Sequence, residues 1–281
     1  MDTAWTAVLG AVQGLTEFLP VSSSGHLAAA ALAAPRLGIG DMGGGEPLLL
    51  GVLLHAATLA AVLVYYRAPA LDAIRGAGRG LRALARGGLG KAIEADDGTR
   101  LAVAICVGTV PTGAIGLALE RPTVGIAESP MALGLCFLAC ALILAATRWW
   151  PGGSRRLDWR AALVVGIVQG IAVLPGVSRS GATIAAGLAL GLPREEAVRF
   201  SFLLSVPAIA GAALLELDAS KLAAGADGVA IGAGCAVAFG VGLLALVLLR
   251  RIVRGGRLWL FAPYVAAVGA ALLIAARGFG G

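Results

Sequence analysis

Six uninterrupted apolar stretches of about 20 residues each constrain the fold of this 281-residue chain more than any other feature. A helix of about 20 apolar residues is long enough to cross the hydrocarbon core of a bilayer. Only 14% of the residues are charged, against about 25% in soluble domains, so the chain has too few polar side chains to cover six such helices in water. The sequence therefore predicts an all-α polytopic membrane protein, with full spans at about residues 47–66, 100–119, 130–147, 197–216, 229–249 and 258–276.

Two further apolar stretches, at about residues 4–34 and 160–192, are interrupted in the middle by polar and helix-breaking residues. The interruptions cover residues 17–26 and 174–181. Each half of such a stretch, with about 13–15 residues, reaches about 20 Å at 1.5 Å per residue, which brings its end to the middle of a bilayer. Each stretch is therefore either a re-entrant helical hairpin, which enters the membrane and returns, or a single broken span.

The distribution of Lys and Arg separates these two alternatives. With both stretches re-entrant, 17 of the 22 basic residues lie on one side of the membrane and 4 on the other, whereas with both stretches crossing the split is 13 to 8. Because basic residues gather on the cytoplasmic side of membrane proteins, we expect two re-entrant hairpins, with both termini outside. The net charge of +6 then reflects topology and does not indicate a nucleic-acid partner.

One long polar connection, residues 67–99, belongs to the basic side. Arg75, Arg79, Arg82 and Arg86 recur in it at helical spacing, with leucines and an isoleucine available for another face. This pattern is typical of an interfacial helix that lies on anionic lipid. Its glycines are equally typical of a solvated basic loop, so both alternatives stay open.

The two interrupted stretches also resemble each other in sequence. Residues 10–15 (GAVQGL) are echoed by residues 166–171 (GIVQGI), and the polar tract after each copy carries Leu-Pro, then serines and a glycine. Three apolar stretches follow each copy, and because three is odd the second copy begins on the opposite face of the membrane. We therefore expect one membrane domain over 1–281 with about ten helical segments. It consists of two inverted repeats, 1–150 and 151–281, each a re-entrant hairpin plus three spans, as in some transporters.

Under this topology four ionisable residues lie inside the membrane, where such residues usually serve function: Glu17, His26, His55 and Arg179. Three of them fall in the two hairpins. His55 lies within a spanning stretch with no loop around it, so we interpret it as a packing residue. Gln13 precedes Glu17 by four positions, so both side chains project from one face of a helix.

Both polar tracts have the composition of an anion site. In the first, Ser22, Ser23, Ser24 and Gly25 precede a second half-helix, whose free N–H groups point into the loop. In the second, Gly176 turns the chain, Arg179 supplies a planar fork suited to phosphate, and hydroxyls come from Ser178, Ser180 and Thr183. A merged site of this kind suits phosphate better than a metal cation or a sugar.

These tracts carry a resemblance to a known family. Gln13-x-x-x-Glu17 followed by residues 20–26 (PVSSSGH) resembles the first signature of the bacterial undecaprenyl-diphosphate phosphatases of the bacitracin-resistance type. Residues 175–183 (PGVSRSGAT) resemble the second signature of that family. The resemblance implies a hydrolase that removes the terminal phosphate of a polyprenyl diphosphate and depends on Mg²⁺ or Ca²⁺. It also implies an active site that opens to the outer, periplasmic side of the bacterial inner membrane.

The expected roles follow from the residue types. Arg179 clamps the diphosphate, helped by Ser178, Ser180, Thr183 and the loop residues Ser22, Ser24, Gly25 and Gly176. Glu17 with Gln13 binds the divalent cation or orients water. His26 acts as general base toward Ser23 or toward a water molecule, or itself attacks phosphorus, and the sequence leaves these nucleophiles open.

Two other functions remain alternatives at this point. One is a transporter that moves a polyprenyl phosphate across the bilayer, and the other is a proton- or Na⁺-coupled carrier of a small solute, which leaves Arg179 without a role. Glycines along the expected spans permit close helix contacts, so a homodimer is an alternative to a monomer.

Overall fold

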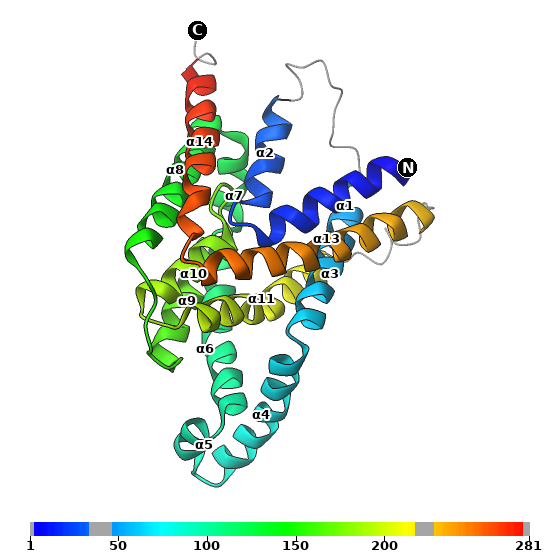
Figure 1. Cartoon of the computed structure of the whole chain (residues 1–281). Coiled ribbons are helices and arrows are strands. Elements are labelled where there is room, and N and C mark those ends of the chain that lie inside the picture. Colours follow the sequence, from blue (N-terminus) through cyan, green and yellow to red (C-terminus); the bar gives the residue numbers. More distant parts are fainter. Residues whose placement is uncertain (1–2, 34–46, 217–227, 278–281) are drawn as a thin grey trace.

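The computed structural model describes residues 3–33, 47–216 and 228–277, and all regular elements in these ranges are helices (Figure 1). Five helical segments among them are long and apolar enough to cross a membrane, so the chain is a multi-pass membrane protein, as predicted. They are α6 (Asp97–Ala118), α8 (Pro130–Ala146) with η2 (Thr147–Trp149), α11 (Arg194–Glu216), α13 (Gly228–Arg254), and η3 (Leu258–Phe261) with α14 (Ala262–Arg277).

The sixth predicted span forms α3 (Pro47–Tyr65), which meets α4 (Arg67–Ala85) at a bend of 85°. This bent pair counts as one further span only if its two helices are taken together. Since α4 and α5 (Leu89–Ala95) cover most of residues 67–99, the solvated-loop alternative for that segment is wrong. The short helix α7 (Glu120–Glu128), which lies between α6 and α8, is not predicted by the apolar pattern of the sequence.

The helical form of α4 is stabilised by a close contact of small residues with α6. A Cβ atom placed on Gly76 would lie 2.1 Å from the carbonyl carbon of Gly98, so only glycine permits the two backbones to approach this closely. Arg79 of α4 also pairs with Asp96, which caps the N-terminus of α6 by accepting a hydrogen bond from Thr99 N. Tertiary contacts thus offset the low helix propensity of the glycines.

Each interrupted stretch forms two helices around a turn. The first gives α1 (Thr3–Phe18) and α2 (Ser23–Ala33), and the second gives α9 (Trp159–Ile171) and α10 (Arg179–Ala189). The first helix of each pair packs on a span from the other half of the chain, α1 along α13 and α9 along α6 (Figure 1).

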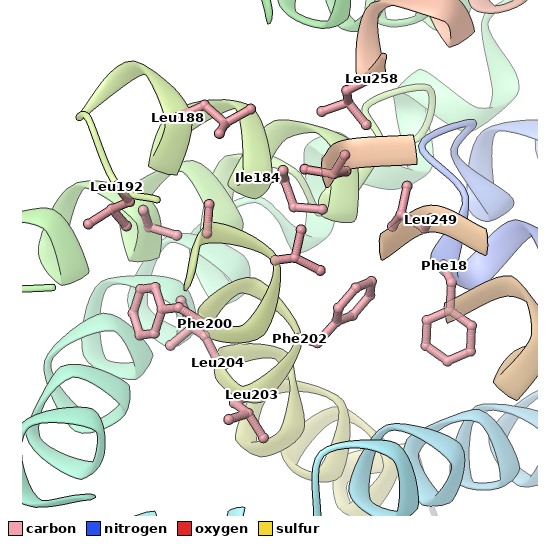
Figure 2. Packing of buried hydrophobic residues seen from close by; sticks show 14 of the residues in the cluster. Phe18, Ile184, Leu188, Leu192, Phe200, Phe202, Leu203, Leu204, Leu249 and Leu258 are labelled. Atoms are coloured by element: carbon pink, nitrogen blue, oxygen red, sulfur yellow. The ribbon is translucent and has the colours of Figure 1, made fainter. Parts of the chain in front are cut away.

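Aromatic packing fixes the end of α1, which carries the acidic candidate residue. Phe18 is 1% exposed, and its ring packs in a T-shaped arrangement with that of Phe202 on α11, with ring centroids 5.6 Å apart. Figure 2 shows this pair in the same core region as Ile184 of α10 and Leu249 of α13. Because buried rings in close contact move little, this packing gives the last turn of α1 a defined position relative to α10.

Candidate active site

The two polar turns are joined by an ion pair between Glu17 and Arg179. Glu17 lies in the last turn of α1, and Arg179 is the first residue of α10, 162 positions further along the chain. The guanidinium of Arg179 donates from Nη2 to Oε1 of the Glu17 carboxylate. The side chain of Glu17 is only 6% exposed, and that of Arg179 is 19% exposed. Because charges are costly to remove from solvent, a buried ion pair in a membrane protein is a candidate functional site.

Three further side chains surround the carboxylate of Glu17. Gln13 donates from Nε2 to Oε2 at 3.2 Å, as the spacing of four predicted, and Ser23 donates its hydroxyl to the same oxygen at 3.4 Å. His55 places Nε2 3.7 Å from Oε2 of Glu17. The structure therefore brings together Gln13, Glu17, Ser23 and Arg179 as expected, and adds His55 to them.

His55 is the residue of this cluster that the sequence interpretation missed. Its Nδ1 donates to the carbonyl oxygen of Gly51 at 2.8 Å, so the ring is fixed with Nε2 toward Glu17. The signal was present in the sequence, because His55 is one of four ionisable residues expected inside the membrane. The absence of a loop around it argued for packing, but α3 brings it to the site from outside both hairpins.

One donor of Arg179 remains open beside this cluster. Its Nη1 is buried and has no hydrogen-bond partner among the residues that the structure describes. A buried N–H without an acceptor is unfavourable, so this atom is positioned for an anionic oxygen that the described residues do not provide. A phosphate group is the ligand that such a fork matches best.

Ser22, Gly25 and Gly176 form the contact between the two turns. Ser22 has a φ of 67°, and its Oγ accepts hydrogen bonds from Gly25 N at 3.3 Å and from Gly176 N at 3.0 Å. A Cβ atom on Gly25 would lie 2.6 Å from Gly176 N. These three residues hold the turns together, and their predicted contact with a diphosphate stays a prediction.

The remaining predicted hydroxyls are used largely inside the protein. Ser178 caps α10 through Gly181 N, and its Oγ lies 3.2 Å from that of Ser180. Thr183 donates to the carbonyl of Arg179 at 2.7 Å and contacts Ser201 Oγ at 2.5 Å. All of these side chains are buried and stabilise the turn that presents Arg179, and their predicted contact with a diphosphate stays a prediction. Of the predicted serines, Ser24 is the exposed one.

His26 makes its hydrogen bonds in the first turn of α2 with residues other than Glu17. Its Nδ1 is 2.8 Å from the carbonyl oxygen of Ser22, and its Nε2 is 2.8 Å from the hydroxyl of Tyr264 on α14. The expected role of His26 as general base therefore stays a prediction. Tyr264 carried no signal in the sequence, since a single tyrosine near the end of an apolar stretch is an ordinary membrane-interface residue.

The predicted cation ligands, Gln13 and Glu17, form only a small set of donors. No group of three or more His, Cys, Asp and Glu side chains with the spacing of a metal site occurs in the described ranges. Glu17 is the single carboxylate of the cluster, and it is already paired with Arg179. These residues alone do not make a closed cation site.

Comparisons with known proteins find related sequences along nearly the whole chain. The model of the family described as Bacitracin resistance protein BacA matches residues 6–271. A protein of Desulfatibacillum aliphaticivorans named undecaprenyl-diphosphatase is 45% identical over 275 residues, which cover 95% of this chain and 96% of the relative. A protein of the same name from Korarchaeum cryptofilum is 41% identical over 97% of this chain and 99% of its own. One from Methanosphaera stadtmanae is 37% identical over 98% of each.

Proposed function

Because the chain belongs to the bacitracin resistance protein BacA family, we propose that it is an integral-membrane hydrolase of undecaprenyl diphosphate. It removes the terminal phosphate and leaves undecaprenyl phosphate, the carrier lipid that cell-wall synthesis uses again. The observation that carries the proposal is the Glu17–Arg179 pair, whose guanidinium keeps one buried N–H without an acceptor in the described chain. The names of the relatives favour this reaction over a carrier that moves polyprenyl phosphate across the bilayer.

Arg179 binds the phosphoryl group that leaves the lipid. Its Nη2 stays on Glu17, while Nη1 donates to a phosphoryl oxygen, which is the acceptor that this atom lacks. In phosphoryl transfer, negative charge is spread over the oxygens of the transferred group in the transition state. A guanidinium held by a second side chain stabilises that charge without moving, which is the main contribution a protein makes to this reaction.

Ser23 is the nucleophile that the geometry favours over His26 or water. Its hydroxyl donates to Oε2 of Glu17, so the carboxylate takes the proton while Oγ attacks the terminal phosphorus. The bond between this phosphorus and the bridging oxygen breaks, and Glu17 passes the proton to the departing lipid phosphate. Glu17 then takes a proton from the water that attacks phosphoserine and returns it to Ser23, which releases inorganic phosphate.

A divalent cation fits this site only when it is shared with the substrate. Mg²⁺ in phosphate-handling proteins is bound by one or two carboxylates together with phosphate oxygens and water. The Glu17 carboxylate, the amide oxygen of Gln13 and the hydroxyl of Ser23 are the oxygen ligands that the chain offers. Gln13 and Glu17 would hold the cation, and Mg²⁺ or Ca²⁺ would supply neutralisation of the diphosphate charge.

Phosphate release by the purified protein tests the function directly. The wild-type chain in detergent is expected to release inorganic phosphate from a polyprenyl diphosphate in the presence of Mg²⁺ or Ca²⁺. Glu17→Gln and Ser23→Ala are expected to abolish it, while Glu120→Gln, an exposed change on α7, keeps it. A ³²P label on Ser23 after an acid quench supports the covalent route. A folded Glu17→Gln protein with normal release would contradict the proposed site.

We further propose that both helix–turn–helix pairs are re-entrant and belong to two inverted repeats. The support is the crosswise packing of equivalent glycines. A Cβ atom on Gly10 would lie 2.2 Å from the carbonyl oxygen of Gly234, and one on Gly166, the equivalent of Gly10, would lie 2.3 Å from that of Gly108. The first repeated helix of each half therefore contacts the other half in the same way, as two halves related by a twofold axis do.

A second glycine contact supports the same axis. A Cβ atom on Gly134 of α8 would lie 3.0 Å from the carbonyl oxygen of Gly269 of α14, and the reciprocal distance is 2.9 Å. A contact that maps onto itself is expected where two equivalent helices meet at a twofold axis. In Figure 1 the turn between α1 and α2 also lies between the end of α14 and the basic helix α4, which mark opposite ends of the molecule.

The orientation in the membrane follows from the same proposal. Both termini and the active site face the outer side of the bacterial inner membrane, and α4 faces the cytoplasm. Single cysteines test this in a variant without native cysteines. Arg121→Cys is expected to react with an impermeant maleimide in intact cells, and Arg86→Cys only after lysis. The opposite pattern would overturn the orientation. A homodimer stays a prediction, which light scattering of the purified protein checks.

A further inference from the structure

The imidazole of His26 contacts aromatic side chains from two other helices, α14 and α8. Its Nε2 is 2.8 Å from the hydroxyl of Tyr264, a residue of α14 that lies 238 positions further along the chain. The two rings are parallel within 3°, with centroids 5.7 Å apart. The ring of Phe137 on α8 packs against the same imidazole in a T-shaped arrangement, with ring centroids 5.3 Å apart and an angle of 84° between the planes.

The hydrogen bonds assign one tautomer to this ring. Nδ1 faces the carbonyl oxygen of Ser22 at 2.8 Å, and since a carbonyl only accepts, Nδ1 carries the hydrogen. Nε2 is then the lone-pair nitrogen, and the hydroxyl of Tyr264 donates to it. Tyr264 is therefore bonded to the one basic atom of His26.

His26 also stabilises the turn at Ser22, which contacts the second loop. The carbonyl oxygen of Ser22 accepts two hydrogen bonds from His26, one from the backbone N–H at 3.1 Å and one from Nδ1–H at 2.8 Å. Ser22 is the one non-glycine residue of the described chain with a positive φ, a conformation that a serine keeps only when its surroundings fix it. Its hydroxyl accepts the N–H of Gly176 from the other loop. Hydrogen bonds thus run without a break from α14 through His26 and Ser22 to the turn before Arg179.

We propose that Tyr264 is a positioning residue, which sets the tautomer and orientation of His26 and through it the turn at Ser22. The expected effect on the reaction rate rests on the proposed hydrolase function, whereas the expected effect on the His26 imidazole does not. Tyr264 itself is 51% exposed and acts on the reaction through another side chain. It is therefore expected to affect the rate of the chemical step and not the binding of the substrate.

The first test observes the imidazole directly. The chain contains two histidines, so ¹⁵N-histidine labelling gives two sets of ring signals, and His55→Gln assigns them. In the wild-type protein, Nδ1 of His26 is expected to be protonated and Nε2 hydrogen-bonded. In Tyr264→Phe, which keeps the ring and removes the hydroxyl, the Nε2 signal of His26 is expected to shift while the signals of His55 stay in place. Unchanged His26 signals would overturn the proposal.

The second test separates positioning from substrate contact. Tyr264→Phe is expected to lower kcat about 3- to 10-fold, the effect of one lost hydrogen bond, with KM unchanged. Tyr264→Ala, which also removes the stacking, is expected to lower it further. Tyr65→Phe, which removes the same group from a tyrosine beside Arg250, is the matched control and keeps wild-type kinetics. A rise in KM alone in Tyr264→Phe would contradict the assigned role.

The two tests also distinguish failure of the inference from failure of the proposed function. If the wild-type protein releases no phosphate, the hydrolase proposal fails, and the ring signals of His26 still decide the role of Tyr264. If release is normal and the His26 signals do not respond to Tyr264→Phe, the hydrolase proposal stands and the positioning role is wrong. Thermal melting of each variant checks that it is folded.

Discussion

Replacing Arg179 with glutamine separates the contribution of the central ion pair to stability from its contribution to catalysis. In Arg179→Gln, the carboxylate of Glu17 remains 6% exposed without its main partner. Breaking a buried pair by removing one partner costs about 3–5 kcal/mol. Because Gln13, Ser23 and His55 still lie within 4 Å of the carboxylate, we expect the lower end of that range, about 3 kcal/mol.

The double variant Glu17→Gln with Arg179→Gln is expected to regain most of this stability. It replaces both charges by neutral groups of similar shape, and buried ion pairs replaced as a pair are often neutral in stability. Activity is expected to behave differently. Loss of one preorganised donor to transition-state charge costs about 10²–10³ in rate, so both the single and the double variant lose at least that factor.

The assay is thermal unfolding in detergent together with release of inorganic phosphate from the same preparations. Arg75→Gln is the matched control, because its pair with Asp72 is 3.9 Å long and about two-thirds exposed, and such pairs contribute about 0–1 kcal/mol. The reasoning is refuted if the double variant melts below Arg179→Gln. It is refuted equally if folded Arg179→Gln keeps kcat/KM within tenfold of wild type.

Three further changes have defined outcomes. His55→Gln is expected to lower kcat about tenfold with an unchanged melting temperature, because it removes the imidazole whose Nε2 lies 3.7 Å from Oε2 of Glu17. Phosphate release within twofold of wild type would exclude this role. Gly166→Ala is expected to destabilise the protein by about 1–3 kcal/mol by overpacking the α9–α6 contact, while Gly240→Ala, with open space around it, shifts stability by less than about 0.5 kcal/mol in the same thermal melts. The hydrogen bonds of Thr99 and Arg79 lower the pKa of Asp96 from 3.8 to about 2, so this carboxylate stabilises the α4–α6 corner above about pH 4 and loses that effect as pH falls toward 2. Melting temperatures followed over this window are expected to fall less steeply in Asp96→Asn than in wild type, and identical slopes would contradict the assignment.

The sequence determined most of the helices and the local part of the candidate site, because both depend on composition or on residues that are close together in the chain. Apolar runs of sufficient length must be helices in a membrane, since no water satisfies their backbone groups there. Gln13 and Glu17 are four residues apart, so helical geometry alone places them on one face. The polar tracts combine proline, glycine and serine within a few residues, and such a combination predicts an interruption of the helix from the sequence alone.

Only the tertiary structure decided which atoms of these tracts face one another. His55 reaches Glu17 because α3 packs beside α1, and Tyr264 reaches His26 because α14 passes the start of α2. Nothing in the local sequence indicates either contact, because each depends on how helices distant along the chain pack.

The same holds for the serines and threonine of the second tract. Their number predicted an anion site, and in the structure Ser178, Ser180 and Thr183 form hydrogen bonds within the protein, while Arg179 of the same tract has a buried N–H without a partner among the described residues. A buried hydroxyl forms hydrogen bonds with the groups that packing brings within about 3 Å of it. The sequence therefore determined which residue types gather at the two turns, and the packing of α1, α2, α3, α10 and α14 decided which partners their side chains contact.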